Sequence, residues 1–137
     1  MMPNYAYFDH DADVGIIGRG DRLEDAFVAA AEGMFALMVN LDDIRPATTV
    51  RFAFDEPDPE LALAVWLNRL LAEARAAGLI FGRFRLTREN GRWVGEASGE
   101  PWRADLERGV EVKGATLTAL AVEQRNGLWE ARCVLDV

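Results

Sequence analysis

Three aspartates near the start of the chain have residue types and a spacing that could bind a cation. Asp9, Asp11 and Asp13 alternate with other residues. In an extended segment, residues two apart point to the same face, so this spacing predicts three carboxylates on one side of a strand. Hard cations such as Ca²⁺ and Mg²⁺ prefer carboxylate and carbonyl oxygens. The residues alone favour a solvated acidic turn, with a cation site as the alternative.

The single histidine and the single serine limit the enzyme classes to which the chain could belong. With His10 alone, a histidine-based zinc site or a histidine-rich catalytic centre lacks ligands. We interpret His10 as a hydrogen-bonded residue that holds its turn in shape, with proton transfer as the alternative. Ser98 lies outside any G-x-S-x-G context, which disfavours a serine hydrolase.

Glycine pattern and net charge disfavour nucleotide and nucleic-acid chemistry. The sequence has no phosphate-binding G-x-x-x-x-G-K-[ST] loop, and the stretch at residues 18–20 lacks the glycine pattern of a dinucleotide site. The chain carries 23 acidic and 15 basic side chains, a formal net charge of -8. This charge repels a phosphate backbone, so we expect no direct nucleic-acid binding.

Two further candidates for a functional role lie late in the chain. Lys113 is the only lysine, and it interrupts an apolar run that reads as a strand, so a site role and a surface role both remain open. Asp136 ends the apolar run of residues 134–137. If this last strand docks beside the first one, Asp136 joins the three aspartates as an oxygen ligand. Cys133 is interpreted as a buried structural thiol.

Two helices are predicted to help position these candidates. The apolar stripe after Asp21 predicts a first helix, with Asp21 as its N-cap. Asp58 as N-cap and Pro59 at the first helical position predict a second helix, which Gly78 ends. Trp66 lies on the apolar stripe of this second helix, which assigns its side chain to the core.

The remaining elements are predicted to be strands, because apolar and polar residues alternate along them. Asn90-Gly91 and Asn126-Gly127 are typical of tight hairpin turns. The pattern therefore predicts an α+β fold, a single domain of residues 1–137 built as a two-layer sandwich, with a largely antiparallel sheet covered on one face by two helices. The predicted strands lie around residues 5–7, 14–17, 50–54, 80–87, 92–100, 109–113, 116–123 and 128–137.

Apolar stretches are short throughout the chain. Acidic or basic residues interrupt them well before the roughly 20 residues that a membrane-spanning helix needs. The first residues also lack the basic-then-apolar pattern of a secretory signal. We therefore expect a soluble cytoplasmic protein with no membrane partner.

A collinear series of short motifs runs through almost the whole chain. It consists of YAYFDHDADVG at residues 5–15, LEDAF at 23–27, WLN at 66–68 with LL at 70–71, GEP at 99–101, EVK at 111–113 and VLDV at 134–137. Each motif alone is weak. In this order, and with matching lengths between them, they resemble the archease family, whose members open with an aromatic residue followed by D-H-T-A-D.

The resemblance implies a metal site at the two ends of the chain. By position, the carboxylates of Asp13 and Asp136 and the main chain of Val137 would hold Ca²⁺, with another divalent metal possible. Asp11 stands where the family usually has threonine. This departure leaves the implied metal ligands intact.

The resemblance also implies residues that act on a partner. The functionally important lysine of the family falls on Lys113, and the aspartate that opens the D-H motif falls on Asp9, followed by His10. Gly114 replaces the usual alanine, and residues 116–119 read T-L-T-A in place of T-Y-H-G. These departures put the local contacts near Lys113 in doubt.

The partner implied by the resemblance is an RtcB-type RNA ligase. Such a ligase uses GTP and metal to join a 2′,3′-cyclic phosphate or 3′-phosphate end to a 5′-hydroxyl, as in tRNA splicing and RNA repair. Archeases speed its guanylylation and restore multiple turnover, so the chain is expected to be a protein cofactor and not an enzyme. The alternatives are a small metal-dependent hydrolase and a general chaperone or nucleic-acid-interaction module. The oligomeric state stays open.

Overall fold

The first and last strands of the chain lie in one antiparallel sheet. The structure is a computed structural model that describes residues 3–137. Strands β1 (Tyr5–His10) and β2 (Asp13–Gly20) form a hairpin. Strand β8 (Leu128–Asp136) pairs with the other side of β2. The far edge of β8 pairs with β6 (Gly114–Ala115) and β7 (Ala121–Arg125). This five-stranded sheet therefore places β8 between the first hairpin and the segment around Lys113.

A second antiparallel sheet contains the three middle strands. They are β3 (Thr48–Phe54), β4 (Leu79–Glu89) and β5 (Arg92–Pro101). Their order in the sheet is β3-β5-β4, so β5 is the central strand. The register of β4 against β5 shifts once, between Phe81 and Arg83.

Two Asn-Gly turns connect neighbouring strands, as the sequence predicted. Asn90 and Gly91 have φ angles of 54° and 79° in the turn between β4 and β5. Asn126 and Gly127, with φ angles of 52° and 81°, make the same connection between β7 and β8. Positive φ at both central residues is the geometry that tight hairpins require.

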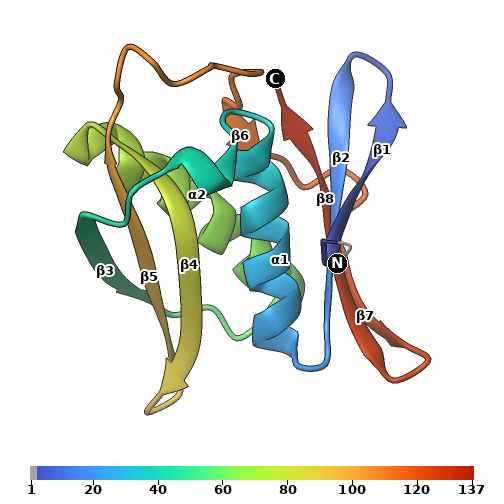
Figure 1. Ribbon diagram of the computed structural model, residues 1–137. Helices are drawn as coiled ribbons and strands as arrows, with labels where there is room; N and C mark the ends of the chain where they lie inside the picture. The colour runs from blue at the N-terminus through green and yellow to red at the C-terminus, as the bar shows by residue number, and fades with distance from the viewer. Residues whose placement is uncertain (1–2) are drawn as a thin grey trace.

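Helices α1 (Leu23–Ala36) and α2 (Pro59–Ala77) lie between the two sheets (Figure 1). On one side α1 packs against β2 and β8, and on the other it packs against β4. The α+β class and the antiparallel strands are confirmed, and each sheet has the helices on one of its faces. The strands form two sheets where one was expected, because alternation identifies the buried face of a strand but not its neighbours. Among the described residues, no helix is apolar over a length that would cross a bilayer.

The helices pack tightly against both sheets. A Cβ atom added to Gly18 would lie 2.2 Å from the carbonyl oxygen of Ala26, so β2 lies directly against the backbone of α1. Trp66 of α2 is 0% exposed, and its Nε1–H donates to the carbonyl oxygen of Phe27 at 2.9 Å. The Phe27 ring stacks on Trp93 of β5, with centroids 5.4 Å apart. The predicted core position of Trp66 is confirmed.

Helix α2 begins and ends where the sequence predicted. The Asp58 side chain accepts hydrogen bonds from the N–H groups of Glu60 and Leu61. Gly78 closes the helix in the left-handed conformation, with φ 68°. Both caps satisfy main-chain groups that the helix itself leaves free.

Helix α1 begins one residue later than predicted. Its N-cap is Arg22, and the Asp25 carboxylate accepts a hydrogen bond from the Arg22 N–H at 3.3 Å. The prediction of Asp21 as N-cap is therefore wrong. Asp25 occupies the third helical position from which an acidic side chain can reach back to the N-cap.

Residues 109–113 do not form the predicted strand. The N–H groups of Gly109 and Val110 donate to the carbonyl oxygens of Met38 and Leu37, both at 2.8 Å. The segment therefore pairs with the chain just after α1 and not with a neighbouring strand. Of its two valines, Val112 belongs to the core, whereas Val110 is exposed.

The predicted strand at residues 116–123 is also only partly present. Val134 N–H donates to the carbonyl oxygen of Thr118 at 3.1 Å, and Ala119 then adopts φ 54°. This left-handed residue interrupts the ladder, so β6 and β7 are separate short strands along β8.

The single cysteine is a core residue, as predicted. Cys133 of β8 is 0% exposed. Burial raises the pKa of its thiol to about 12, which keeps it protonated at neutral pH. Its chemistry is that of a small apolar side chain.

Candidate functional site

The β1–β2 hairpin carries the first three aspartates, but on different faces. The turn consists of Asp11 and Ala12, and Asp11 has φ 53°. Asp13 lies opposite His10 and therefore shares its face, whereas Asp9 lies opposite Val14 on the other face. The prediction that all three aspartates share one face is wrong, because a turn reverses the chain between them.

The hairpin is anchored to α1 through strand β1. Tyr7 Oη donates to the carbonyl oxygen of Gly33 at 2.7 Å. Partial burial of the phenol, with Tyr5 beside it, raises the pKa of Tyr7 to about 12, so this donor stays protonated. The Phe8 ring on the other face lies directly over Gly15, where a Cβ atom would be 2.2 Å from the ring. These contacts fix the strands that lead to the turn.

Asp13 and Asp136 come together through the pairing of β2 with β8. Val14 pairs with Leu135, and the residues next to this pair are Asp13 on one strand and Asp136 on the other. Continuing the antiparallel register by one residue sets the two aspartates opposite each other, on one face of the sheet. The last strand thus docks beside β2, and not beside β1 as the sequence analysis supposed.

Lys113 reaches the same end of the sheet from the other side of β8. Its main-chain N–H donates to the carbonyl oxygen of Asp136 at 2.7 Å, and the next residue, Gly114, pairs with Asp136. The Lys113 side chain is exposed. Figure 1 shows the β1–β2 turn and the end of β8 at the same end of the molecule. We call Asp9, His10, Asp13, Lys113, Asp136 and Val137 the acidic tip.

The donor set of the acidic tip suits a hard cation. Asp13 and Asp136 offer carboxylate oxygens, and the Val137 main chain follows directly. All of these donors are oxygens, which Ca²⁺ and Mg²⁺ prefer. Within residues 3–137, no group of three or more His, Cys, Asp or Glu side chains is arranged to hold a metal. A cation here would therefore depend on main-chain oxygen, water or a partner for its remaining ligands.

The contact between the side chains of His10 and Asp11 is long. Its Nδ1 lies 4.0 Å from Asp11 Oδ2, which is too far for a hydrogen bond. The Asp11 side chain is 95% exposed, so this ion pair contributes little. This contact therefore does not give His10 the turn-holding hydrogen bond that the sequence analysis favoured.

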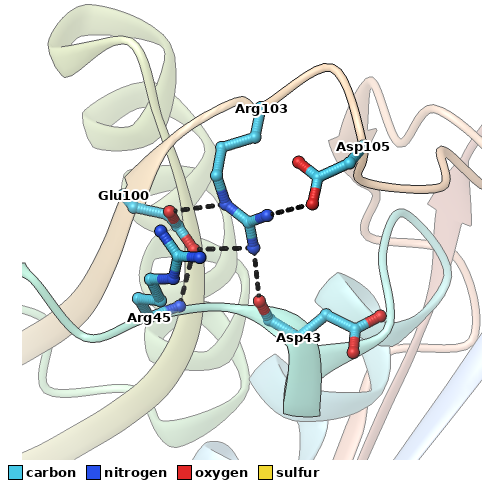
Figure 2. Close-up of polar contacts among 5 residues, drawn as sticks. All are labelled: Asp43, Arg45, Glu100, Arg103 and Asp105. Atoms are coloured by element: carbon cyan, nitrogen blue, oxygen red, sulfur yellow. Dashed lines mark hydrogen bonds and ion pairs between the residues drawn. The ribbon is translucent and has the colours of Figure 1, made fainter.

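An ion-pair network around the buried Glu100, which the sequence did not predict, lies at the end of β5 (Figure 2). Glu100 is 5% exposed and accepts hydrogen bonds from the Arg45 N–H at 2.7 Å and from Arg103 Nε at 2.9 Å. Arg103 also donates to the Asp43 carbonyl oxygen at 2.8 Å and to Asp105 at 2.6 Å. The network holds the start of the connection that leads to Lys113. Its only sequence signal is an acid at a strand end with an arginine three residues later.

We expect this network to make folding stability depend on pH. The hydrogen bonds from Arg103, and then that from the Arg45 N–H, lower the pKa of Glu100 below its usual 4.5. A lowered folded-state pKa gives stability that is present above pH 4.5 and lost as pH falls through the folded-state pKa. Glu100→Gln should lower the free energy of unfolding at pH 7. The difference in this free energy between wild type and the variant should shrink as the pH falls below about 5.

Urea unfolding at a series of pH values checks this expectation. Glu107→Gln removes an exposed carboxylate from the same connection and is the matched control. A wild-type to Glu100→Gln difference that stays constant from pH 7 to acid would show that the ionised carboxylate does not hold the connection.

Comparison with known proteins gives consistent matches over nearly the full length. The model of the archease protein family (MTH1598/TM1083) matches residues 5–137. The protein archease of Sulfolobus acidocaldarius is 32% identical over 139 residues, which cover 99% of this chain and 100% of that protein. The protein archease of Pyrococcus furiosus is also 32% identical, over 142 residues with the same coverage.

Two solved structures have a similar fold. The solution structure of protein 1598 of Methanobacterium thermoautotrophicum superposes with a TM-score of 0.84 at 27% identity, covering 99% of this chain and 100% of that one. A crystal structure of a Thermotoga maritima archease, described as a possible chaperone, gives a TM-score of 0.70 at 19% identity, covering 95% and 94%. At this lower identity the likeness concerns the fold alone.

Proposed function

Because this chain belongs to the archease family, we propose that it is a protein cofactor that activates an RtcB-type RNA ligase. It promotes the GTP-dependent guanylylation of the ligase and its multiple turnover. It acts in the cytoplasm, in tRNA splicing and RNA repair. The chain itself turns over no substrate. The observation that supports this proposal best is the meeting of Asp13, Asp136 and Lys113 at one end of the five-stranded sheet.

In this proposal the acidic tip holds a divalent cation. The carboxylates of Asp13 and Asp136 and a main-chain oxygen of Val137 would be its ligands, with Ca²⁺ favoured and other divalent metals possible. When bound, the cation supplies positive charge that can stabilise phosphate oxygens. Because Ca²⁺ takes about six to eight oxygen ligands, these three leave positions for water or for groups of the ligase.

In this proposal the side chains of the acidic tip have different roles in ligase activation. Lys113 brings an exposed ammonium group, with three donors and no acceptor, towards the GTP phosphates. Asp9 and His10 lie on opposite faces of the hairpin and contact the ligase beside the phosphate site. The contacts favour the ligase conformation that is competent for guanylylation, which is a shift between two states.

Charge supports a protein partner and not an RNA partner. The net charge of -8 opposes a phosphate backbone. The same charge complements the metal ions of a metal-dependent ligase, and complementary charge speeds encounter. Lys113 is the basic residue of the acidic tip.

Guanylylation of a cognate ligase tests the proposal. The ligase is incubated with GTP and a divalent metal, with and without substoichiometric amounts of this protein. We expect each molecule of this protein to promote guanylylation of several ligase molecules. Failure of the folded protein to stimulate would instead favour a general chaperone-like binding module. Hydrolysis of a phosphate ester by the isolated protein with metal would favour a hydrolase.

A further inference from the structure

Two polar side chains of α2 bind the main chain of the segment that carries Lys113. The Asn68 amide makes a pair of hydrogen bonds with Ala115: its Oδ1 accepts from the Ala115 N–H at 2.9 Å, and its Nδ2 donates to the Ala115 carbonyl oxygen at 3.0 Å. Arg75 Nη2 donates to the carbonyl oxygens of Val112 at 2.9 Å and of Lys113 at 3.1 Å. Asn68 and Arg75 are seven residues apart, so they lie on one face of the helix.

These contacts leave no free main-chain group on Lys113. Its N–H donates to the Asp136 carbonyl oxygen at 2.7 Å, and its carbonyl oxygen accepts from Arg75. Strand β8 therefore fixes Lys113 from one side and α2 fixes it from the other. An edge strand normally presents unpaired N–H and C=O groups, and here the Asn68 side chain pairs with both groups of Ala115 in β6.

Side-chain packing holds the chain at Val112, the residue before Lys113, whereas Val110 and Glu111 are exposed. A cavity of about 530 Å³ lies under them, lined by apolar residues of both helices and by Arg75. Val110 and Glu111 line the same cavity and are exposed, whereas Val112 is 1% exposed. Gly109 and Val110 are held by their bonds to Met38 and Leu37, and from Val112 onwards the hydrogen bonds from Arg75 and Asn68 hold the main chain on the side of α2.

We propose that Asn68 and Arg75 are positioning residues of the acidic tip, which hold Lys113 in the place where it acts on the ligase. The proposal rests on the function proposed above. Its physical basis is preorganisation: a displacement of a reacting group by about 1 Å can cost roughly 100-fold in rate. Neither residue contacts the partner in this proposal, since each acts through the main chain of residues 112–115.

The first test compares Asn68→Ala and Arg75→Ala with wild type in ligase guanylylation. Each variant should lower the maximal stimulation by roughly tenfold, with a smaller change in the concentration that gives half-maximal stimulation. The amide protons of Lys113 and Ala115 should exchange faster with solvent in both variants. Millimolar guanidinium ion should restore activity to Arg75→Ala, because it replaces the missing guanidinium group. It should not restore activity to Asn68→Ala, which lacks an amide.

A double-mutant cycle separates positioning from a general loss of stability. In a Lys113→Ala background, adding Arg75→Ala or Asn68→Ala should leave the residual stimulation unchanged, since both act through Lys113. Arg83→Ala and Gln124→Ala remove an exposed arginine and an exposed amide elsewhere and should leave stimulation at the wild-type level.

Three results would overturn the proposal. The first is wild-type stimulation by folded variants, and the second is unchanged amide exchange at Lys113 and Ala115. The third is a full additional loss in the Lys113→Ala background. A wild-type protein that fails to stimulate the ligase at all would instead overturn the proposed function, and this inference with it. That outcome is visible before any variant is made.

Discussion

Converting Asp13 and Asp136 together to asparagine is expected to abolish binding of Ca²⁺ at the acidic tip. The two residues follow the Val14–Leu135 pair on neighbouring strands, so their carboxylates are the charged part of the proposed ligand set. Loss of a residue that merely orients a metal ligand costs about 10–100-fold in affinity. Loss of both carboxylates should exceed that range, because Ca²⁺ affinity depends on the number of charged ligands.

Titration calorimetry with Ca²⁺ measures this effect. The matched control is Asp11→Asn with Asp21→Asn, which removes two exposed carboxylates near the same strands and makes the net charge less negative by the same amount. Asparagine also tolerates the positive φ of residue 11. Equal weakening in the control pair would mean that general negative charge, and not a specific ligand pair, attracts the cation.

The same variants connect the cation to the proposed function. At limiting divalent metal, Asp13→Asn with Asp136→Asn should stimulate ligase guanylylation far less than wild type, whereas the control pair should act normally. Full stimulation by a variant that no longer binds Ca²⁺ would remove the cation from the activation mechanism. The Lys113 contribution would then stand alone.

Local sequence signals predicted the elements whose geometry depends on few residues. The two Asn-Gly turns and the Asp58 and Gly78 ends of α2 were predicted because their side chains or their freedom at positive φ act within a few residues. The start of α1 was missed by one residue, since the N-cap is Arg22, whose N–H donates to the Asp25 carboxylate. Such errors arise where several acidic residues lie within one helical turn.

Faces and neighbours were harder to predict than elements. The acidic turn favoured for residues 9–13 is present, but Asp11 forms it without the glycine that marks the other hairpins, so the sequence did not show where the chain reverses. Because the chain reverses at this turn, Asp9 lies on the opposite face from Asp13, and the three aspartates do not share a face. Register converts a shift of one residue into a change of face, which is why a short turn matters so much.

Long-range contacts of the main chain had no sequence signal. The bond from Lys113 to Asp136 and the bonds from Asn68 and Arg75 to residues 112–115 join groups distant in sequence through peptide atoms that every residue has. The resemblance to a family suggested that Lys113 and Asp136 matter. Only the fold indicates which neighbours hold them.

Trp66→Ala is expected to cost about 3–5 kcal/mol in the free energy of unfolding, the range for removing a large buried aromatic side chain. Trp66 is fully buried between the helices and the three-stranded sheet. Its ring lies near Phe52, with centroids 5.8 Å apart, and leaves no room for a side chain at Gly95. Truncation would also leave the carbonyl oxygen of Phe27 without its donor, and an unpaired buried acceptor is costly.

Urea unfolding followed by circular dichroism measures this loss, with two variants to interpret it. Trp66→Phe keeps an aromatic ring but loses the Nε1–H and part of the ring volume, so its loss should lie between zero and that of Trp66→Ala. Trp102→Ala removes a half-buried tryptophan whose ring stacks under Arg108, and it should cost clearly less than Trp66→Ala. Equal losses at Trp66 and Trp102 would contradict a core centred on α2. Since α2 also carries Asn68 and Arg75, a stable α2 core is the condition under which Lys113 can be held in place.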